Sequence, residues 1–405
     1  MSCCGSCSSS ALAIWIAAAL SASPDGGEPP APLVPIDGGV ERAGRPDAGS
    51  PRPALPARPA IARIAVFPPV NLTGGAVELK PLGNLLQAKL AGEGLDAVGG
   101  DALEPFLSRH RIRYTGGVDR EVAAAAGSEL GVAGILVTSV DLYQANPPDF
   151  GASMRLVSAD RKAEILWAGG AARAFDDEPG WFDLGIASTP QLLEAEVFAR
   201  TARALAASLS SHGPHAMACA DDARFLPKVR FRSAGLDSSE YAIAVLPFQN
   251  ESSHPDADDL LALQFVRQLR AIGNFRVLEP GVVRSELLHF RIVMDNGISL
   301  DTARVILELL HADLVIAGIV RDYRDALLKG TAPSVEFTVF ALERQDDEVV
   351  WESTSHGRGD DQVLFFDVGR VSTAPELACR MVRAVVRDIA DPRPPASRAA
   401  LRRRR

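Results

Sequence analysis

The chain has 405 residues, of which 47% are hydrophobic and 23% are charged, with a formal net charge of −9. This composition permits sizeable buried cores and excludes a wholly disordered chain. The acidic balance excludes a global basic field of the kind that holds nucleic acid. Length alone, at roughly 150 residues per domain, indicates two or three domains.

Residues 1–23 are predicted to be a signal peptide. The apolar run 11–20 has the length of a signal-peptide core and is followed by small residues, although residues 1–10 contain no Lys or Arg. The run is too short for a membrane span, which needs about 20 residues. The alternative is a short hydrophobic stub on a cytoplasmic protein. Residues 20–23 resemble a bacterial lipobox in which Ser23 replaces the lipid-accepting Cys. We therefore expect a periplasmic or envelope-associated protein that is not lipidated.

Residues 24–60 are predicted to form a disordered linker. Between Pro24 and Pro59 there are ten prolines and six glycines. Such a composition cannot bury a core and stays extended and solvated. The segment is either a tether or an unselected leader.

An internal repeat dominates the rest of the sequence. Three pairs of segments align at offsets of 179, 180 and 184 residues: 64–71 with 243–250, 130–143 with 310–323, and 165–167 with 349–351. A unit of this length is too long for a solenoid repeat, so each copy should own a core. We predict a first copy at residues 61–210, an inter-domain segment at 211–239, and a second copy at 240–390.

The second copy predicts its elements most clearly. We expect strands at 242–249, 275–278, 313–320, 335–342 and 348–353, and helices at 256–272, 281–290, 299–311 and 375–389. In the last helix Leu377, Met381, Val385 and Ile389 share one face, and Thr373 with Glu376 fits a capping box. Strands joined through helices imply parallel neighbours, and a hairpin adds antiparallel ones. The fold class is therefore α+β, with two tandem copies of a β-α-β-α-α-β-β-β-α domain, each a mixed sheet packed with helices.

The motifs of the second copy resemble a known family. IAVLPFQN at 243–250, FRVLE at 275–279, HADLVIAGIV at 311–320 and VVW at 349–351 resemble the TolB amino-terminal domain and the CsgG-like and penicillin-binding-protein-activator-like domains of the bacterial envelope. The first copy departs from the pattern at Pro69. The resemblance implies a non-enzymatic envelope protein that acts through protein contacts. No propeller repeats follow the domain, and no long amphipathic hairpins are present.

The sequence offers no recognisable catalytic constellation. It lacks a P-loop, a GxSxG elbow, an HExxH helix and a DxDxDG loop. None of the seven histidines has triad spacing to a nucleophile. We predict no enzyme activity, no catalytic residues and no cofactor.

The cysteines indicate little about the redox compartment of the protein. Of the five cysteines, only Cys219 and Cys379 lie beyond the amino-terminal region, too few for a disulfide framework and too far apart for a zinc knuckle. Imidazole and thiolate groups at His212, His215 and Cys219 could bind a soft divalent metal, but the spacing fits no closed zinc pattern. We assign no metal residues.

Two equivalent acidic and aromatic segments are the most plausible interaction loops. Their members are Asp176, Asp177, Asp183 and Gly185 in the first copy and Asp360, Asp361, Asp367 and Gly369 in the second. Carboxylates beside glycine could hold calcium or a partner's basic group. The alternative is a loop whose aromatics plug the core and whose Ser or Thr caps the last helix.

The combined expectation is an exported assembly or regulatory factor whose partners are envelope proteins. Residues 391–405 form a basic tail that is expected to be disordered, with Arg402 to Arg405 at its end. The tail allows at most peripheral membrane contact. The two copies are expected to pack on each other. The alternative is a small-molecule or divalent-cation-binding module that uses the acidic loops.

Overall fold

The computed structural model describes residues 63–177, 189–209, 215–233, 241–272, 275–292, 300–326, 331–344, 349–363 and 369–390. The predicted signal peptide, linker and basic tail lie outside these ranges, as do Asp183, Gly185, Asp367 and His212. Both sheets described below belong to one compact unit of the chain. In the described ranges, no helix is long and apolar enough to cross a membrane.

The first copy forms a mixed sheet. Its elements are β1 (Arg63–Val66), β2 (Val70–Asn71), α1 (Leu79–Gly92), β3 (Asp96–Val98), α2 (Glu104–Arg109), α3 (Arg120–Leu130), β4 (Gly134–Ala145), β5 (Pro148–Ser158), β6 (Ile165–Ala174) and α4 (Pro190–Leu209). The strand order is β3-β1-β4-β5-β6, with β2 beside β4. Strands β3, β1 and β4 run parallel because helices connect them, whereas β4, β5 and β6 form an antiparallel meander.

The second copy repeats this order. Its elements are β8 (Ala242–Val245), β9 (Gln249–Asn250), α5 (Ala257–Ile272), β10 (Arg276–Val277), α6 (Pro280–His289), α7 (Leu300–Leu310), β11 (Leu314–Arg324), β12 (Ser334–Glu343), β13 (Val349–Arg358) and α8 (Ala374–Ala390). The sheet order is β10-β8-β11-β12-β13, with β9 beside β11. Two mixed sheets with packed helices confirm the predicted α+β fold class.

One strand was not expected. β7 (Lys228–Arg232) lies in the predicted inter-domain segment and pairs antiparallel with β13 at the edge of the second sheet. Val229 and Phe231 remain 38% and 44% exposed. The strand therefore buries no complete apolar face, and backbone pairing with β13 holds it in place. A sequence pattern based on burial has no signal for such a strand.

The apolar spacing of the last helix is confirmed. Leu377, Met381, Val385 and Ile389 are all buried in one core with α5 and the second sheet. The expected capping box is replaced by other partners. Asp325 accepts the N–H of Ala374 at 3.2 Å, and the Glu376 carboxylate bonds Arg380 at 2.9 Å.

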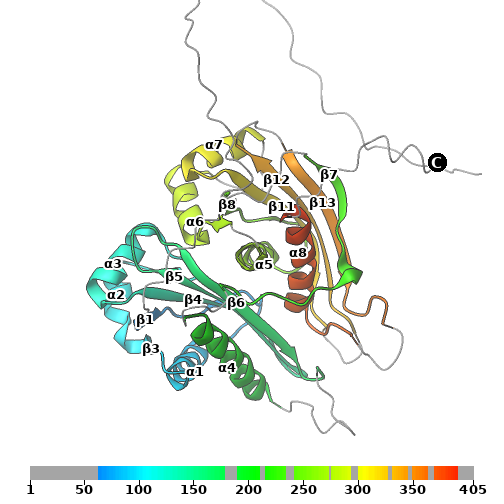
Figure 1. The fold of residues 1–405 in the computed structure, drawn as a ribbon. Coiled ribbons are helices and arrows are strands. Elements are labelled where there is room, and N and C mark those ends of the chain that lie inside the picture. The colour runs from blue at the N-terminus through cyan, green and yellow to red at the C-terminus, as the bar shows by residue number, and fades with distance from the viewer. Residues whose placement is uncertain are drawn as a thin grey trace, which may run out of the picture. The chain divides into compact units, whose positions relative to one another are not determined.

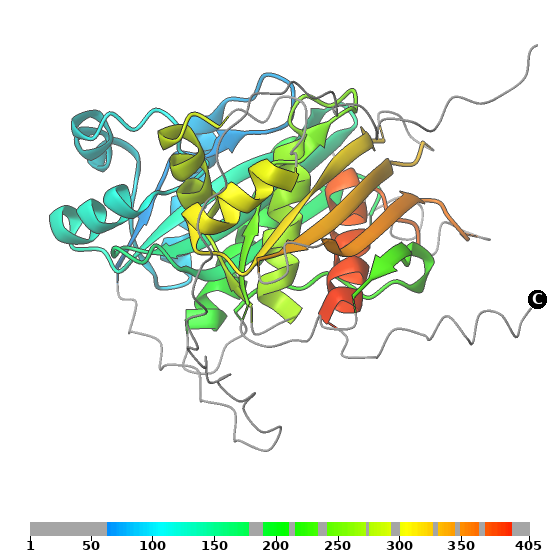
Figure 2. The same cartoon turned by 90° about the horizontal axis from the view of Figure 1, so that it is seen from above.

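The two copies stack head to tail. Helices α1 and α4 pack on one face of the first sheet, and α2 and α3 cover part of its other face. The rest of that second face meets α5 and α8 of the second copy, which also pack on β11 to β13 (Figures 1 and 2). Helix α5 is consequently enclosed by two sheets, and it buries residues around most of its circumference.

Candidate functional site: the cavity between the copies

A buried ion pair joins the two copies. Arg155 on β5 donates from Nε to Glu279 Oε2 at 3.2 Å and from Nη2 to Glu279 Oε1 at 3.1 Å. The two side chains are only 4% and 0% exposed. Nη2 also donates to the Gly116 carbonyl at 2.8 Å. The two parallel hydrogen bonds fix the orientation of the copies at an interface that excludes water. Breaking the pair would leave an uncompensated buried charge.

A second buried polar group, the carboxyl of Asp141, lies near the interface between the copies. Asp141 on β4 is buried and accepts hydrogen bonds from the hydroxyls of Ser139, at 2.6 Å, and Ser153. Burial raises the pKa of Asp141 to about 6, while the two hydroxyls and the nearby Arg267 and Arg155 oppose that rise. The pKa of this buried carboxyl therefore lies above that of an ordinary aspartate.

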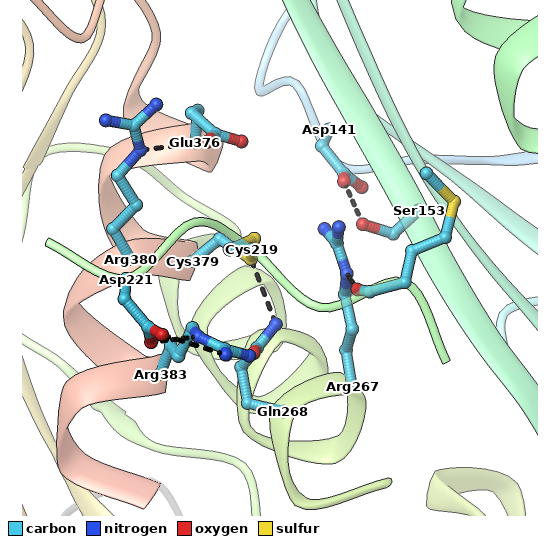
Figure 3. The surroundings of a disulfide bond; sticks show 11 residues. Asp141, Ser153, Cys219, Asp221, Arg267, Gln268, Glu376, Cys379, Arg380 and Arg383 are labelled. Carbon is cyan, nitrogen blue, oxygen red and sulfur yellow. Dashed lines mark hydrogen bonds and ion pairs between the residues drawn. A yellow bond between two sulfur atoms is a disulfide. The ribbon is translucent and has the colours of Figure 1, made fainter. Parts of the chain in front are cut away.

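Arg267 on α5 extends toward this carboxyl from the second copy (Figure 3). Only 7% of Arg267 is exposed, and its Nε donates to the Met217 carbonyl at 2.6 Å. Burial lowers the pKa of Arg267 to about 10, and Glu376 and Asp141 offset part of that effect by Coulombic attraction. In the part of the chain that the structure describes, no carboxylate lies within ion-pair distance of this guanidinium.

Arg267 forms one wall of a cavity of about 350 Å³. We call it the inter-copy cavity, because β6 and α4 of the first copy and α5, α8 and residues 370–373 of the second line it. Residues 217–220 of the inter-domain segment form a further wall. The charged side chains that line it are Arg173, Arg200, Arg267, Arg370, Arg380, Asp177 and Glu376. Five cations thus face two carboxylates.

Two of these arginines are neutralised by carboxylates. Arg173 contacts Glu196 at 2.8 Å and Asp177 at 3.8 Å. Arg380 contacts Glu376 at 2.9 Å and Asp222 at 3.3 Å.

The other three arginines are not neutralised within the described residues. Arg200, Arg267 and Arg370 have no carboxylate within 4.0 Å there. The Nε atom of Arg370 is buried without a hydrogen-bond acceptor, although its Nη2 donates to the Thr331 carbonyl. The site is therefore cationic, with guanidinium donors that protein carboxylates do not occupy.

A disulfide closes the cavity wall and corrects the interpretation of the cysteines. Cys219 and Cys379 are joined, with their Cα atoms 6.0 Å apart, across a sequence separation of 160 residues (Figure 3). The bond ties the inter-domain segment to α8. It also withdraws the Cys219 thiol from the hypothetical metal-ligand set with His215. Two cysteines so far apart in sequence gave no spacing signal for this pairing.

The predicted acidic loops have separate roles. Asp177 accepts the Ala174 N–H at 3.0 Å and a hydrogen bond from Ser372 of the other copy. Burial raises the pKa of Asp177. Asp177 thus lies at the inter-copy cavity beside residues 370–373, which belong to the equivalent loop of the second copy.

The other described members form turns. Asp360 contacts Arg358 at 3.1 Å, and the hydrogen bond from Arg358 lowers its pKa. Asp361 accepts the Arg358 N–H at 2.8 Å. Gly369 has a positive φ of 83°, and its carbonyl accepts a bond from Arg224 at 2.7 Å. Asp176 lies in the turn after β6. Within the described residues, no three His, Cys, Asp or Glu side chains are grouped as a metal site requires.

Sequence reasoning missed the arginines because it treated each copy alone. Gln264, Arg267 and Gln268 lie off the apolar face of α5, so a single-copy interpretation places them in solvent. Gln268 instead donates to Cys379 Sγ on α8 at 3.1 Å, and the burial of the other two has one weak signal in the sequence. Leu260, Gln264 and Arg267 follow helical spacing on a second face of α5.

Comparison with known proteins adds only limited information. No protein-family model matches the chain, and no curated protein matches it in sequence. Among solved structures, the PelC dodecamer from Paraburkholderia phytofirmans is 19% identical, with a TM-score of 0.27, over 40% of this chain and 97% of that one. Lipoprotein GNA1162 from Neisseria meningitidis is 22% identical, with a TM-score of 0.25, over 28% and 80%. The LpoB C-terminal domain from Salmonella enterica is 14% identical, with a TM-score of 0.23, over 31% and 87%.

Likenesses of this size carry no argument about activity or partners. Each covers less than half of this chain. The resemblance to TolB and CsgG domains stays a prediction.

Proposed function

We propose that the chain is an exported, non-enzymatic protein of the bacterial envelope that acts through contacts with other envelope proteins. The observation that carries the proposal is the disulfide between Cys219 and Cys379. Structural disulfides form and persist in oxidising compartments and are rare in the cytosol of mesophiles. A buried cross-link between segments 160 residues apart fits a protein that folds after export.

The edge of the second sheet supports the contact part of the proposal. β7 ends the strand order, so its outer backbone groups face no further strand among the described residues. Leu226, Val229 and Phe231 are 70%, 38% and 44% exposed there, beside the exposed Lys228 and Arg230. An open edge with exposed apolar side chains is suited to pairing with a strand of a partner protein. Arg230 and Arg232 already contact Glu352 and Asp388 at 3.7 and 3.9 Å, whereas the exposed Lys228 favours a partner strand that carries an acidic group.

A second candidate function is small-molecule binding, which the inter-copy cavity favours. The charge in that cavity is positive, opposite to a site built from the acidic loops. Binding of a divalent cation to those loops stays a separate prediction, which calorimetry with calcium on the native protein would test.

The export proposal is tested by mass spectrometry of the full-length protein expressed in its native host. Thiols are alkylated in intact cells before lysis, and both the amino terminus and the oxidation state of Cys219 and Cys379 are determined. We expect an amino terminus beyond residue 20 and an unalkylated, cross-linked pair. Recovery of Met1 or Ser2 together with two alkylated cysteines would contradict export.

The proposed contact through β7 is tested by crosslinking from a defined position. A photocrosslinking amino acid is placed at Phe231 on β7 and, as a matched control, at the exposed Asn84 on α1. We expect an adduct with one exported protein from position 231 and none from position 84. Equal adducts at both positions, no adduct at 231, or adducts with cytoplasmic proteins only would reject β7 as the partner surface.

A further inference from the structure

We infer that the inter-copy cavity is a binding site for a small anion that carries a phosphate group. Three guanidinium groups line it without a carboxylate partner in the described ranges: Arg200 from α4, Arg267 from α5 and Arg370 from the loop before α8. They come from both copies, so the site exists only in the assembled tandem. The inference goes beyond the proposed envelope function and does not depend on it.

Arg267 provides the first argument. A guanidinium that is 7% exposed is costly to bury unless a counter-charge and hydrogen-bond acceptors satisfy it. The Met217 carbonyl supplies one neutral acceptor, at 2.6 Å from Nε. Asp141 and Glu376 act on Arg267 only through longer-range Coulombic attraction. A bound anion would supply the contact charge that the described protein groups do not.

Arg370 provides an independent argument. Its Nε is buried without an acceptor, and one Nη atom is held by the Thr331 carbonyl. A donor in this state has lost its water without gaining a bond, which costs free energy that an anion's oxygen would recover. The carbonyl contact fixes the guanidinium plane at the wall of the cavity.

The number of donors and the size of the cavity identify the chemical class. A phosphate monoester carries up to two negative charges and three free oxygens, and guanidinium groups bind such oxygens in pairs. Three unpaired arginines match this better than they match one carboxylate with a single charge. The volume of about 350 Å³ lies at the lower end for small-molecule sites, so the ligand is a small molecule.

Two carboxylates also line the cavity, and both already have partners within the protein. Glu376 is held by Arg380 at 2.9 Å, and Asp177 is bonded to Ala174 and lies 3.8 Å from Arg173. Asp177 nonetheless repels an incoming anion. Replacing it with an uncharged isostere should therefore strengthen binding.

The probe is inorganic phosphate, titrated by calorimetry into the full-length oxidised protein at pH 7.5, with sodium chloride at equal ionic strength as reference and citrate as a carboxylate competitor. Arg200→Gln and Arg370→Gln test the site, and Asp177→Asn tests the charge sign. The matched control is Arg203→Gln on the same helix, whose side chain is 71% exposed and contacts Glu93 outside the cavity. All variants are first checked for native melting behaviour.

We expect saturable phosphate binding that falls about tenfold in Arg200→Gln and in Arg370→Gln and is unchanged in Arg203→Gln, since hydrogen bonds to charged groups are each worth roughly one factor of ten or more. Asp177→Asn should tighten binding several-fold. The inference is overturned if phosphate produces no more heat than chloride, if citrate binds and phosphate does not, or if all three arginine variants behave alike. Because Arg200 is exposed and unpaired among the described residues, its variant remains informative if Arg370→Gln does not fold.

Discussion

The two copies present the same sheet face to different surroundings, and the side chains differ accordingly. Strand pairing places Ser153 opposite Gly170 in the first copy, and Thr338 opposite Thr354 at the equivalent positions of the second. Arg155 and Ala168 of the first copy correspond in the same way to Phe340 and Glu352 of the second. The residues of the first face are small or buried and contact α5, whereas those of the second are half-exposed and, apart from Phe340, polar. The same fold therefore provides one sheet face that the other copy covers and one that the other copy leaves uncovered.

The equivalent helices α1 and α5 differ in the same way. Helix α1 buries only Leu82, Leu86 and Leu90, on one face. Helix α5 holds the corresponding place in the second copy and buries residues toward both sheets, including Gln264, Arg267 and Gln268. The outer face of α1 and the outer face of β12 and β13, which the other copy does not cover, carry polar groups.

The largest effect should come from removing one member of the buried ion pair in the covered face. Arg155→Met leaves Glu279 charged at 0% exposure, and we expect a loss of about 3–5 kcal/mol in the free energy of unfolding. The matched control is Arg120→Ala, whose pair with Glu286 also joins the copies but is 43% and 29% exposed. That exposed pair should cost less than about 1 kcal/mol. Equal losses in urea denaturation would contradict the importance of burial.

The disulfide should rank second, because it holds the inter-domain segment against α8 beside the covered face. Reduction, or the variant Cys219→Ser with Cys379→Ser, should cost about 2–5 kcal/mol. Thermal melts with and without a reductant measure this loss. The doubly substituted variant is the control, since its melting temperature should not respond to the reductant. A native protein that is equally insensitive would contradict the cross-link.

Sequence reasoning recovered the elements that depend on one copy alone. The helix face of Leu377, Met381 and Val385 was predictable, because residues spaced by four must share a side of a helix. The hairpin of β12 and β13 was equally visible, since alternation and turn residues are local signals. The neighbouring positions of β4, β5 and β6, and of β11, β12 and β13, follow from connections between consecutive strands.

The candidate site was not recoverable in this way, because it forms only where the copies meet. Arg155 and Glu279 are 124 residues apart, and either charge by itself indicates a solvated surface. Arg267 likewise gains its significance from a sheet that is distant in sequence. Of the predicted loop residues, Asp177 reaches the inter-copy cavity, because β6 ends beside it.

A moderate effect should follow from adding one methyl group between the copies. A Cβ atom on Gly281 of α6 would lie 2.1 Å from the Val118 backbone nitrogen of the first copy, which cannot rotate away. We expect Gly281→Ala to cost about 1–3 kcal/mol through overpacking. Gly92→Ala, at the end of α1, is the control because no atom lies within 4 Å of its added Cβ. It should change the free energy of unfolding by less than about 1 kcal/mol, with a favourable sign. Denaturant melts that rank the two variants alike would contradict the close approach.

The last effect concerns one residue of the covered face and disappears at low pH. Asp141 and Arg321 occupy equivalent irregularities in β4 and β11, but Asp141 is 2% exposed, whereas the Arg321 side chain is 49% exposed and contacts Glu251. Burial raises the pKa of Asp141 to about 6 from 3.8, so the folded state holds this proton more tightly than the unfolded state. The contribution of Asp141 to stability is therefore greatest below about pH 4 and falls as the pH rises toward 6, where it levels off.

Asp141→Asn removes this dependence while keeping a side chain that can bond Ser139 and Ser153. We expect the variant to be more stable than the native protein by up to about 3 kcal/mol at pH 8 and nearly equal to it at pH 4, since the pKa is raised by about two units and each unit corresponds to about 1.4 kcal/mol. Urea denaturation at the two pH values measures the difference. Arg321→Gln, at the equivalent exposed position, is the control and should give the same small change at both. A variant that is less stable at pH 8 would show that the ionised carboxylate, through Arg267 and Arg155, stabilises the interface between the copies more than its burial costs.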